Sequence, residues 1–186
     1  MKLNSSLAYL GASIAASRSW RVALNEAHRH YHTLDHIEAM LAQIPPGQES
    51  RELVAAIWLH DIVYDPEASD NEEQSARRAK EDLKYTQVDR DMVASLIVGT
   101  KHHEGGSDTQ NLLNDLDLGI LGVPRALYVQ YCEKIRAEYA HISDDVYRPG
   151  RAAILKRFND RHLFKTRFFS ISSHWHIAIW NGKSGC

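Results

Sequence analysis

The feature that most constrains this chain is a pair of polar residues inside an apolar run. Residues 54–64 read Val-Ala-Ala-Ile-Trp-Leu-His-Asp-Ile-Val-Tyr, so His60 and Asp61 stand among hydrophobic side chains. A carboxylate buried without a partner is strongly unfavourable, and buried charges are normally paired or bound to a metal ion. The run therefore predicts a metal site whose other ligands come from elsewhere in the chain.

Hydrophobic residues elsewhere recur at helical spacing. Leu3, Leu7, Leu10 and Ile14 fit one amphipathic helix, whereas the alternation of apolar and polar residues that marks strands is rare. Because 186 residues suit one domain, we predict an all-α fold, a single helical bundle. Further helices are expected over residues 19–27, 33–43, 49–64, 70–85, 89–103, 112–118, 125–141 and 147–158.

Local signals refine two of these segments. Asp70, followed three residues later by Glu73, has the form of a capping box and is expected to start the helix over residues 70–85. From Phe168 onward the chain loses charge and helical periodicity. Residues 169–186 therefore form an atypical tail that the pattern assigns to neither helix nor strand.

Composition limits the classes of partner. A net charge of −2 gives no general attraction to nucleic acid or to anionic membranes, so we expect neither duplex nucleic acid nor a membrane as a partner. No apolar run approaches the roughly 18 residues of a membrane span. Cys132 and Cys186 lack the CxxC spacing of zinc sites, and a cytoplasmic location is expected. Eleven histidines are the unusual feature, since histidine is a common metal ligand.

Two histidine-containing pairs occur in the first third of the chain. His32 and His36 are four residues apart, so they share a face if the segment is helical and could then bind one metal ion. The alternative for His32 is a hydrogen bond at the helix start. His60 and Asp61 point about 100° apart on a helix, but both reach one ion that sits at the helix end. Their alternative is a buried hydrogen bond between the two side chains.

Two further pairs follow downstream. His102 and His103 precede a glycine break, where they are either metal ligands or protonated side chains that interact with the helix dipole. Asp115 and Asp117 stand among leucines in a short predicted helix. Two carboxylates in an apolar helix indicate a ligand, although Asp115 could instead cap the helix.

The order of these groups resembles that of the HD-domain superfamily of metal-dependent phosphohydrolases: a His, a His-Asp pair, a His pair and then an Asp. The local sequences that match are Leu34-Asp-His36-Ile, Leu59-His-Asp-Ile62 and Asp115-Leu-Asp-Leu118. Four longer segments look like a small bacterial branch of uncharacterised, predicted HD phosphohydrolases: Arg29-His-Tyr-His-Thr-Leu-Asp-His36, Trp58-Leu-His-Asp-Ile-Val-Tyr-Asp65, Asp70-Asn-Glu-Glu-Gln-Ser75 and Thr100-Lys-His-His103. The resemblance covers roughly residues 20–168.

The resemblance implies an HD-type helical domain over residues 1–168, with its core at 20–160 and the atypical tail at 169–186. It implies one tight divalent ion (Mn, Fe, Co, Ni, Mg or Zn) as cofactor, bound by mixed nitrogen and oxygen ligands. The metal ligands implied are His36, His60, Asp61 and Asp117. His102 and His103 are candidates for a weaker second site, because Asn71-Glu72-Glu73 stands where binuclear relatives carry a further histidine.

The resemblance also implies an enzyme that hydrolyses a phosphate ester, with a nucleotide or a related small metabolite as the phosphorylated substrate. The catalytic candidates are Asp61 together with Glu72 and Glu73, which could orient the attacking water or protonate the leaving oxygen. The candidate substrate contacts are Arg29, His32 and Lys101. The alternatives are a metal-binding regulatory module without turnover and a di-iron oxygenase on the same scaffold. A homodimer is compatible with all three.

Overall fold

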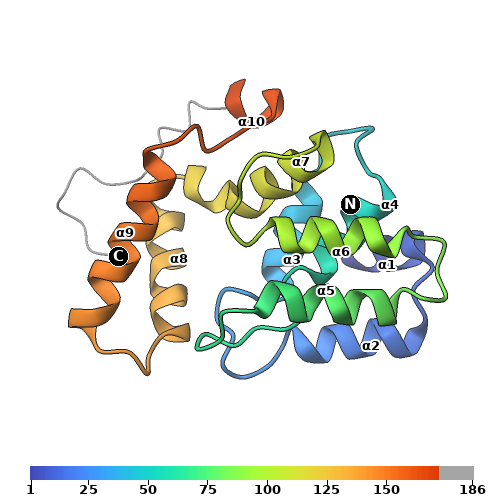
Figure 1. Ribbon diagram of the computed structural model, residues 1–186, viewed down its shortest axis with the longest axis horizontal. Helices are drawn as coiled ribbons and strands as arrows, with labels where there is room; N and C mark the ends of the chain where they lie inside the picture. Colours follow the sequence, from blue (N-terminus) through green and yellow to red (C-terminus); the bar gives the residue numbers. More distant parts are fainter. Residues whose placement is uncertain (172–186) are drawn as a thin grey trace.

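The computed structural model describes residues 1–171, which form helices joined by short turns (Figure 1). No strand occurs within this range, so the all-α prediction is confirmed. No helix in it is long and apolar enough to cross a membrane. The elements are α1 (Leu3–Leu10), α2 (Ile14–Ala23), α3 (Leu34–Gln43), α4 (Arg51–Leu59), α5 (Asn71–Asp82), α6 (Arg90–Gly99), α7 (Asp108–Asp117), the 3₁₀ helix η1 (Leu118–Gly122), α8 (Arg125–Glu138), α9 (Asp144–Asn159) and α10 (Arg167–Ile171).

The tail predicted for residues 169–186 begins as helix, because residues 169–171 belong to α10. Residues 172–186, and with them Cys186, lie outside the described part of the chain.

The single helix predicted over residues 3–14 is wrong, because the chain turns at Gly11. Gly11 has a left-handed φ of 66°, and its N–H donates to Ala8 O at 3.1 Å, which ends α1. Ser13 then starts α2, since its Oγ accepts from Ala16 N at 3.1 Å. Ile14 is consequently 82% exposed instead of sharing the buried face of Leu7.

The central helix, α4, is also shorter than predicted and ends at Leu59 instead of Tyr64. Every residue from Leu53 to Leu59 is buried. Two carbonyls that lie beyond its end are bound by a side chain: Arg29 Nη1 donates to Asp61 O at 2.7 Å, and Arg29 Nη2 to Ile62 O at 3.3 Å. The arginine stabilises the turn that presents His60 and Asp61.

The start of α5 differs from the predicted capping box. Asp70 occupies the N-cap position, but its side chain forms no capping hydrogen bond. Asn71 instead pairs with the backbone of Asp65, donating to Asp65 O at 2.8 Å and accepting from Asp65 N at 3.0 Å. The helix therefore begins where the sequence predicted, but the preceding turn is closed by a different side chain.

Hydrophobic side chains form two buried clusters. The larger lies among α1 to α7 and surrounds α4. The smaller lies between η1, α8 and α9, and α8 and α9 form a helical hairpin beside the first seven helices (Figure 1). Phe164 packs against both clusters. The polar groups described next lie where these two parts of the molecule meet.

Candidate metal centre

The four predicted metal ligands come together at the ends of three helices. His36 is on the first turn of α3, His60 and Asp61 follow α4, and Asp117 is the last residue of α7. His36 Nε2 lies 3.0 Å from Asp117 Oδ1. His60 Nε2 lies 3.0 Å from Asp61 Oδ2 and 3.6 Å from Asp117 Oδ1. Each of the three segments thus contributes a group to one buried cluster.

The orientation of the His60 ring directs one of its nitrogens at the two carboxylates. His60 Nδ1 is 3.0 Å from Ile57 O, and because a carbonyl only accepts, Nδ1 carries the proton. His60 Nε2 is therefore the nitrogen that faces the two carboxylates, and it is buried without a hydrogen-bond partner. A lone pair that faces carboxylate oxygens is repelled unless a proton or a metal ion lies between them. A neutral histidine fixed through its second nitrogen is the usual arrangement at metal sites.

The separations within the cluster fit metal coordination. Ligand atoms of His36, His60 and Asp61 all lie within 4.8 Å of one another. In octahedral coordination with bonds of about 2.1 Å, neighbouring ligand atoms lie about 3.0 Å apart, close to the spacings found here. Two imidazoles and two carboxylates suit Mn, Fe, Co, Ni or Zn, and also Mg where water completes the coordination. The residues present therefore fit a divalent ion.

Electrostatics within the cluster favour charged side chains. Burial opposes protonation of His60, but Asp61 and Asp117 outweigh it and hold the pKa of His60 well above its usual value. Burial likewise opposes ionisation of Asp61, and His60 and His32 outweigh it, so the pKa of Asp61 is lowered. The pKa of Asp117 is lowered in the same way, chiefly by His60 against burial. Both carboxylates are therefore ionised and available to a cation.

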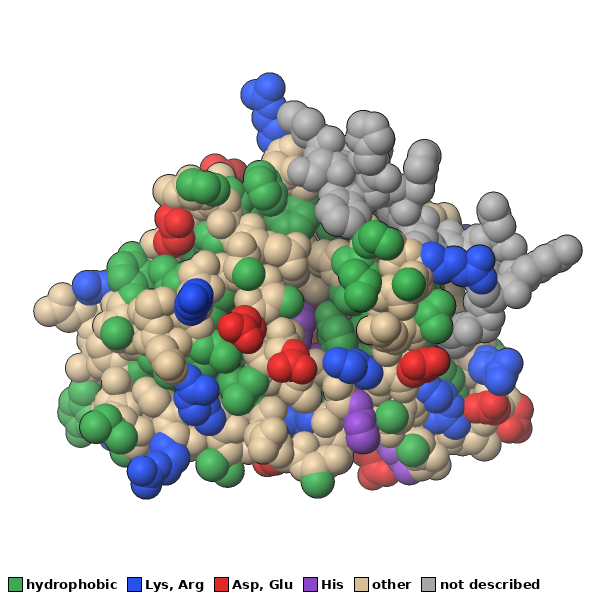
Figure 2. Space-filling view, turned by 180° about the vertical axis from the view of Figure 1, so that it is seen from behind, with side chains coloured by type: hydrophobic (Ala, Val, Ile, Leu, Met, Phe, Trp, Pro, Cys, Tyr) green, Lys and Arg blue, Asp and Glu red, His purple; other side chains and the backbone are tan. Residues whose placement is uncertain are grey.

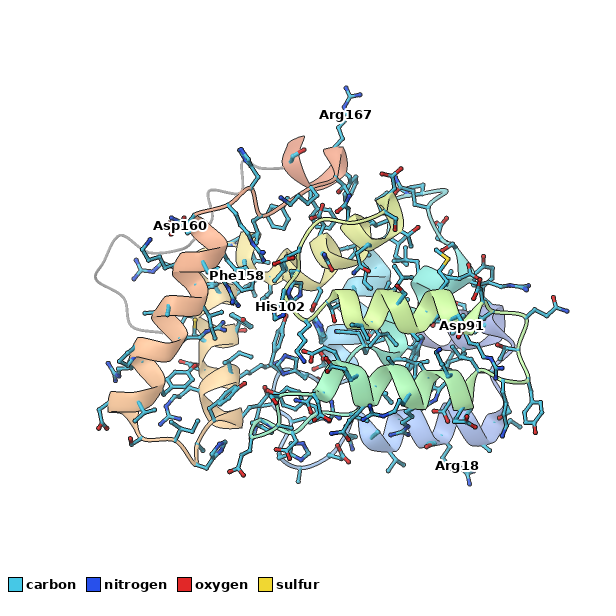
Figure 3. All side chains as sticks on the ribbon, viewed as in Figure 1. Arg18, Asp91, His102, Phe158, Asp160 and Arg167 are labelled. Atoms are coloured by element: carbon cyan, nitrogen blue, oxygen red, sulfur yellow. The ribbon has the colours of Figure 1, made fainter. Side chains whose placement is uncertain are left out.

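The two histidines of the candidate second site separate in the structure. His103 Nε2 is 2.7 Å from Asp117 Oδ2, so His103 extends the cluster. Its backbone φ of 50° is the only positive value at a non-glycine position between residues 1 and 171. Such backbone strain is common at functional sites. His102 is exposed and lies on the loop after α6, facing the hairpin that carries Phe158 (Figure 3), where its carbonyl accepts from Arg161 Nη1 at 3.0 Å.

His32 does not share a helical face with His36, because α3 begins only at Leu34. His32 Nδ1 lies 2.7 Å from Glu138 Oε2. The other oxygen, Glu138 Oε1, accepts three backbone N–H groups, from His30 at 2.8 Å, Tyr31 at 2.7 Å and His32 at 3.0 Å. Burial opposes the charge on His32, but Asp61 and Glu138 outweigh it and raise the pKa of His32.

Glu138 is a residue of the site that sequence reasoning missed. It is 4% exposed and belongs to α8, more than 100 residues from the segment it holds. A signal for it existed in the spacing of the helix, since Tyr131, Ile135 and Glu138 share one buried face. A carboxylate on the buried face of an amphipathic helix indicates a partner elsewhere, but the helix pattern does not name that partner.

Arg29, the arginine predicted to contact substrate, is buried and donates its hydrogen bonds to acceptors within the protein. Arg29 is 5% exposed, and besides Asp61 O and Ile62 O its guanidinium donates to Glu26 Oε2 at 3.1 Å and to His32 O at 3.2 Å. In this structure Arg29 shapes the site by holding the backbone on either side of it.

Lys101, Glu72 and Glu73 form a separate polar group. Lys101 Nζ donates to Glu73 Oε1 at 2.6 Å and to Ser69 O at 2.7 Å, and it lies 4.0 Å from Glu72 Oε2. These contacts tie the end of α6 to the start of α5. Within residues 1–171, no hydrogen bond or ion pair joins these three side chains to the four metal-ligand candidates.

A cavity of about 280 Å³ opens beside the cluster, and His36 and Asp117 form part of its wall. Space-filling atoms show a hollow on the back face of the molecule, with histidine at its base and hydrophobic side chains beside it (Figure 2). The apolar wall consists of Ala39, Met40, Leu116, Ile120, Val123 and Leu127. Its other residues are Tyr31, Asp35, Gln43, Gln130, Tyr131 and Lys134.

Comparison of the chain with protein-family models, with curated proteins and with solved structures gave no match. The resemblance to HD phosphohydrolases stays a prediction.

Proposed function

We propose that this chain is a metal-dependent phosphohydrolase that binds a divalent ion through His36, His60, Asp61 and Asp117. The observation that carries the proposal is the geometry of the cluster: His60 Nε2 forms no hydrogen bond but lies 3.0 Å from Asp61 Oδ2 and 3.6 Å from Asp117 Oδ1, and Asp117 and His36 line an open cavity. A bound divalent ion would lower the pKa of a water molecule and polarise a phosphoryl oxygen. The cavity volume of about 280 Å³ suits a small phosphorylated metabolite, a nucleotide at most.

The chain's own residues support this chemistry in three ways. Asp61 and Asp117 stay ionised because nearby histidines lower their pKa values against the effect of burial. The pKa of His32 is raised by Asp61 and Glu138 against burial, so positive charge on His32 next to Asp61 is favoured. Arg29 holds the backbone of Asp61 in place through its hydrogen bond to Asp61 O. Glu72, Glu73 and Lys101 lie in a polar group of their own, which gives them no defined part in the proposed mechanism.

The test combines metal analysis with an activity panel. Protein purified without added metal is analysed by inductively coupled plasma mass spectrometry, then assayed against phosphate monoesters, diesters and nucleotides with each divalent ion. We expect at least one ion per chain and hydrolysis of a small ester. The Asp61→Asn variant, purified in parallel, controls for contaminating phosphatases and should be inactive.

Other outcomes separate the rival functions. Bound metal without hydrolysis of any ester, in protein that is folded, would favour a regulatory module. Two iron ions per chain with oxygen consumption would favour an oxygenase. A chain that binds no divalent ion at any concentration would remove the basis of all three functions.

A further inference from the structure

The cavity beside the metal ligands has a second polar side, formed by two tyrosines. Tyr31 and Tyr131 line it together with His36 and Asp117. The Tyr31 ring lies 4.9 Å from the His36 ring and 4.6 Å from the Tyr131 ring. A molecule that fills this cavity therefore meets both the candidate metal ligands His36 and Asp117 and the two tyrosines.

A hydrogen bond from Arg151, which lies on α9 and does not line the cavity, sets the direction of the Tyr131 hydroxyl proton. Arg151 Nη2 donates to Tyr131 Oη, and because a guanidinium cannot accept, the hydroxyl must direct its own proton elsewhere. Burial raises the pKa of Tyr131 more than Arg151 lowers it, so the hydroxyl keeps its proton. Among residues 1–171 no side chain or carbonyl accepts that proton, whereas a ligand in the adjoining cavity could do so.

Arg151 is a largely buried cation without a carboxylate partner in the described range. Its contacts are with Tyr131, whose ring centroid is 5.3 Å from the guanidinium carbon, and its Nε is buried without a hydrogen-bond partner. The Tyr147 hydroxyl is also buried and unpartnered. By contrast Arg148, on the same helix, is exposed and pairs with Asp144 at 3.0 Å. A buried guanidinium without a counter-ion is costly, and an anion near Tyr131 would supply the missing negative charge.

We propose that Tyr131 donates its hydroxyl hydrogen bond to a phosphoryl oxygen of the substrate, and that Arg151 is a positioning residue that orients this hydroxyl. The inference rests on the proposed function, which supplies a phosphate ester as the ligand of the cavity. Lys134 lies one turn further along α8 and also lines the cavity, so it adds positive charge on the same side. The phosphoryl group is thus held between the metal side and the tyrosine side.

Phosphate binding tests the role of Tyr131 directly. Inorganic phosphate is titrated calorimetrically into the protein with its bound metal, and the metal content of every variant is measured in parallel. We expect Tyr131→Phe to bind phosphate about tenfold more weakly with unchanged metal content, as the loss of one hydrogen bond to a charged group predicts. Tyr128→Phe is the matched control, because Tyr128 is buried on the same helix but does not line the cavity, and it should bind phosphate as the wild type does.

A double-mutant cycle tests the positioning role of Arg151. Arg151→Gln alone should weaken phosphate binding about fivefold, because a misdirected hydroxyl loses most of its hydrogen bond. In the Tyr131→Phe background the same change should have a clearly smaller effect, because only the direct attraction between the Arg151 charge and phosphate is then lost. Arg148→Gln is the control on the same helix. An equal loss in both backgrounds would show that Arg151 does not act through Tyr131.

The outcomes distinguish this inference from the proposed function. Wild-type phosphate affinity in Tyr131→Phe, or no phosphate binding by the metal-loaded wild type, overturns the inference. If esters are hydrolysed but Tyr131→Phe is fully active and binds phosphate normally, only the inference fails. If phosphate binds in a Tyr131-dependent manner but no ester is hydrolysed, the anion site stands and the hydrolase assignment fails.

Discussion

Asp115 and Asp117 lie only two residues apart and look alike in the sequence, but their contacts in the structure give them different roles. Asp117 lies with His36, His60 and His103 in the candidate metal centre. Asp115 is fully buried on the other side of α7 and accepts from Lys165 N at 2.9 Å, Thr166 N at 2.7 Å and Thr166 Oγ1 at 2.6 Å. The first is placed to bind an ion, whereas the second holds the segment that leads into α10.

Replacing Asp115 should reduce stability without removing metal. Asp115→Ala removes a buried carboxylate that accepts from three partly buried donors, which should lower the free energy of unfolding by about 3 kcal/mol. Urea denaturation measures the loss, and Asp108→Ala, an exposed position on the same helix, should cost less than about 1 kcal/mol. Loss of bound metal from a folded Asp115→Ala protein would contradict the division of roles.

Replacing a metal-ligand candidate should instead remove the bound metal. We expect His60→Ala and Asp61→Ala to abolish bound metal, because each removes one of the few ligands of the ion. Mass spectrometry of the purified variants measures occupancy, with His102→Ala as the control because His102 is exposed and outside the cluster. Full occupancy in both cluster variants would falsify the proposed centre.

At the scale of elements, the position of α7 depends on how closely it approaches α6. A Cβ on Gly99, the last residue of α6, would lie 2.2 Å from Gln110 Oε1. Gln110 in turn donates to Leu96 O at 3.2 Å and to Asn114 Oδ1 at 2.9 Å. The absence of a side chain at Gly99 therefore leaves room for the Gln110 amide between α6 and α7.

A pair of glycine substitutions tests this contact. Gly99→Ala should lower the free energy of unfolding by about 2 kcal/mol, since the added Cβ displaces the buried Gln110 amide from its hydrogen bonds to Leu96 O and Asn114 Oδ1. Gly150→Ala, inside α9 with nothing within 4 Å of the added Cβ, should instead raise it by about 0.5–1 kcal/mol through helix propensity. Thermal and urea denaturation measure both, and equal effects of the two substitutions would count against the packing argument.

At the scale of the whole molecule, the helical hairpin of α8 and α9 meets the first seven helices through a buried acid. Glu138 on α8 binds three backbone N–H groups before α3, and its Oε2 also accepts from Tyr64 Oη at 2.9 Å. Burial opposes its ionisation, but His32 and these backbone groups outweigh it and lower the pKa of Glu138 to about 2. The metal-ligand candidates all belong to the first seven helices, but the cavity beside them is also lined by α8 and is complete only when the two parts are docked.

Docking should therefore weaken in acid. The pKa of Glu138 is lower in the folded chain than its ordinary value, so its stabilisation is complete above about pH 4.5 and falls as the pH drops toward about 2. We expect Glu138 to account for about 1 kcal/mol of the stability lost between about pH 5 and about pH 3, after the full linkage of about 2 kcal/mol is reduced for solvent screening. Urea denaturation at both pH values measures this, and Glu138→Gln, less stable at about pH 5, should lose correspondingly less between them. An identical loss in the variant and the wild type would contradict the assignment.

The sequence by itself determined the all-α fold and the approximate positions of the helices, because helical periodicity and caps are local properties of the chain. The cost of burying a charge predicted that His60 and Asp61 need partners, and the resemblance to HD phosphohydrolases implied that those partners are His36 and Asp117. The structure places these four side chains in one cluster.

Only the tertiary structure decided where the helices end and which side chains complete the site. The carbonyls beyond α4 accept hydrogen bonds from Arg29. The loop before α3 is held by Glu138, which is more than 100 residues away. Tyr131 reaches the cavity because α8 packs beside η1. Such contacts depend on how helices pack in three dimensions, and the periodicity of each helix shows which face is buried but not what it will meet.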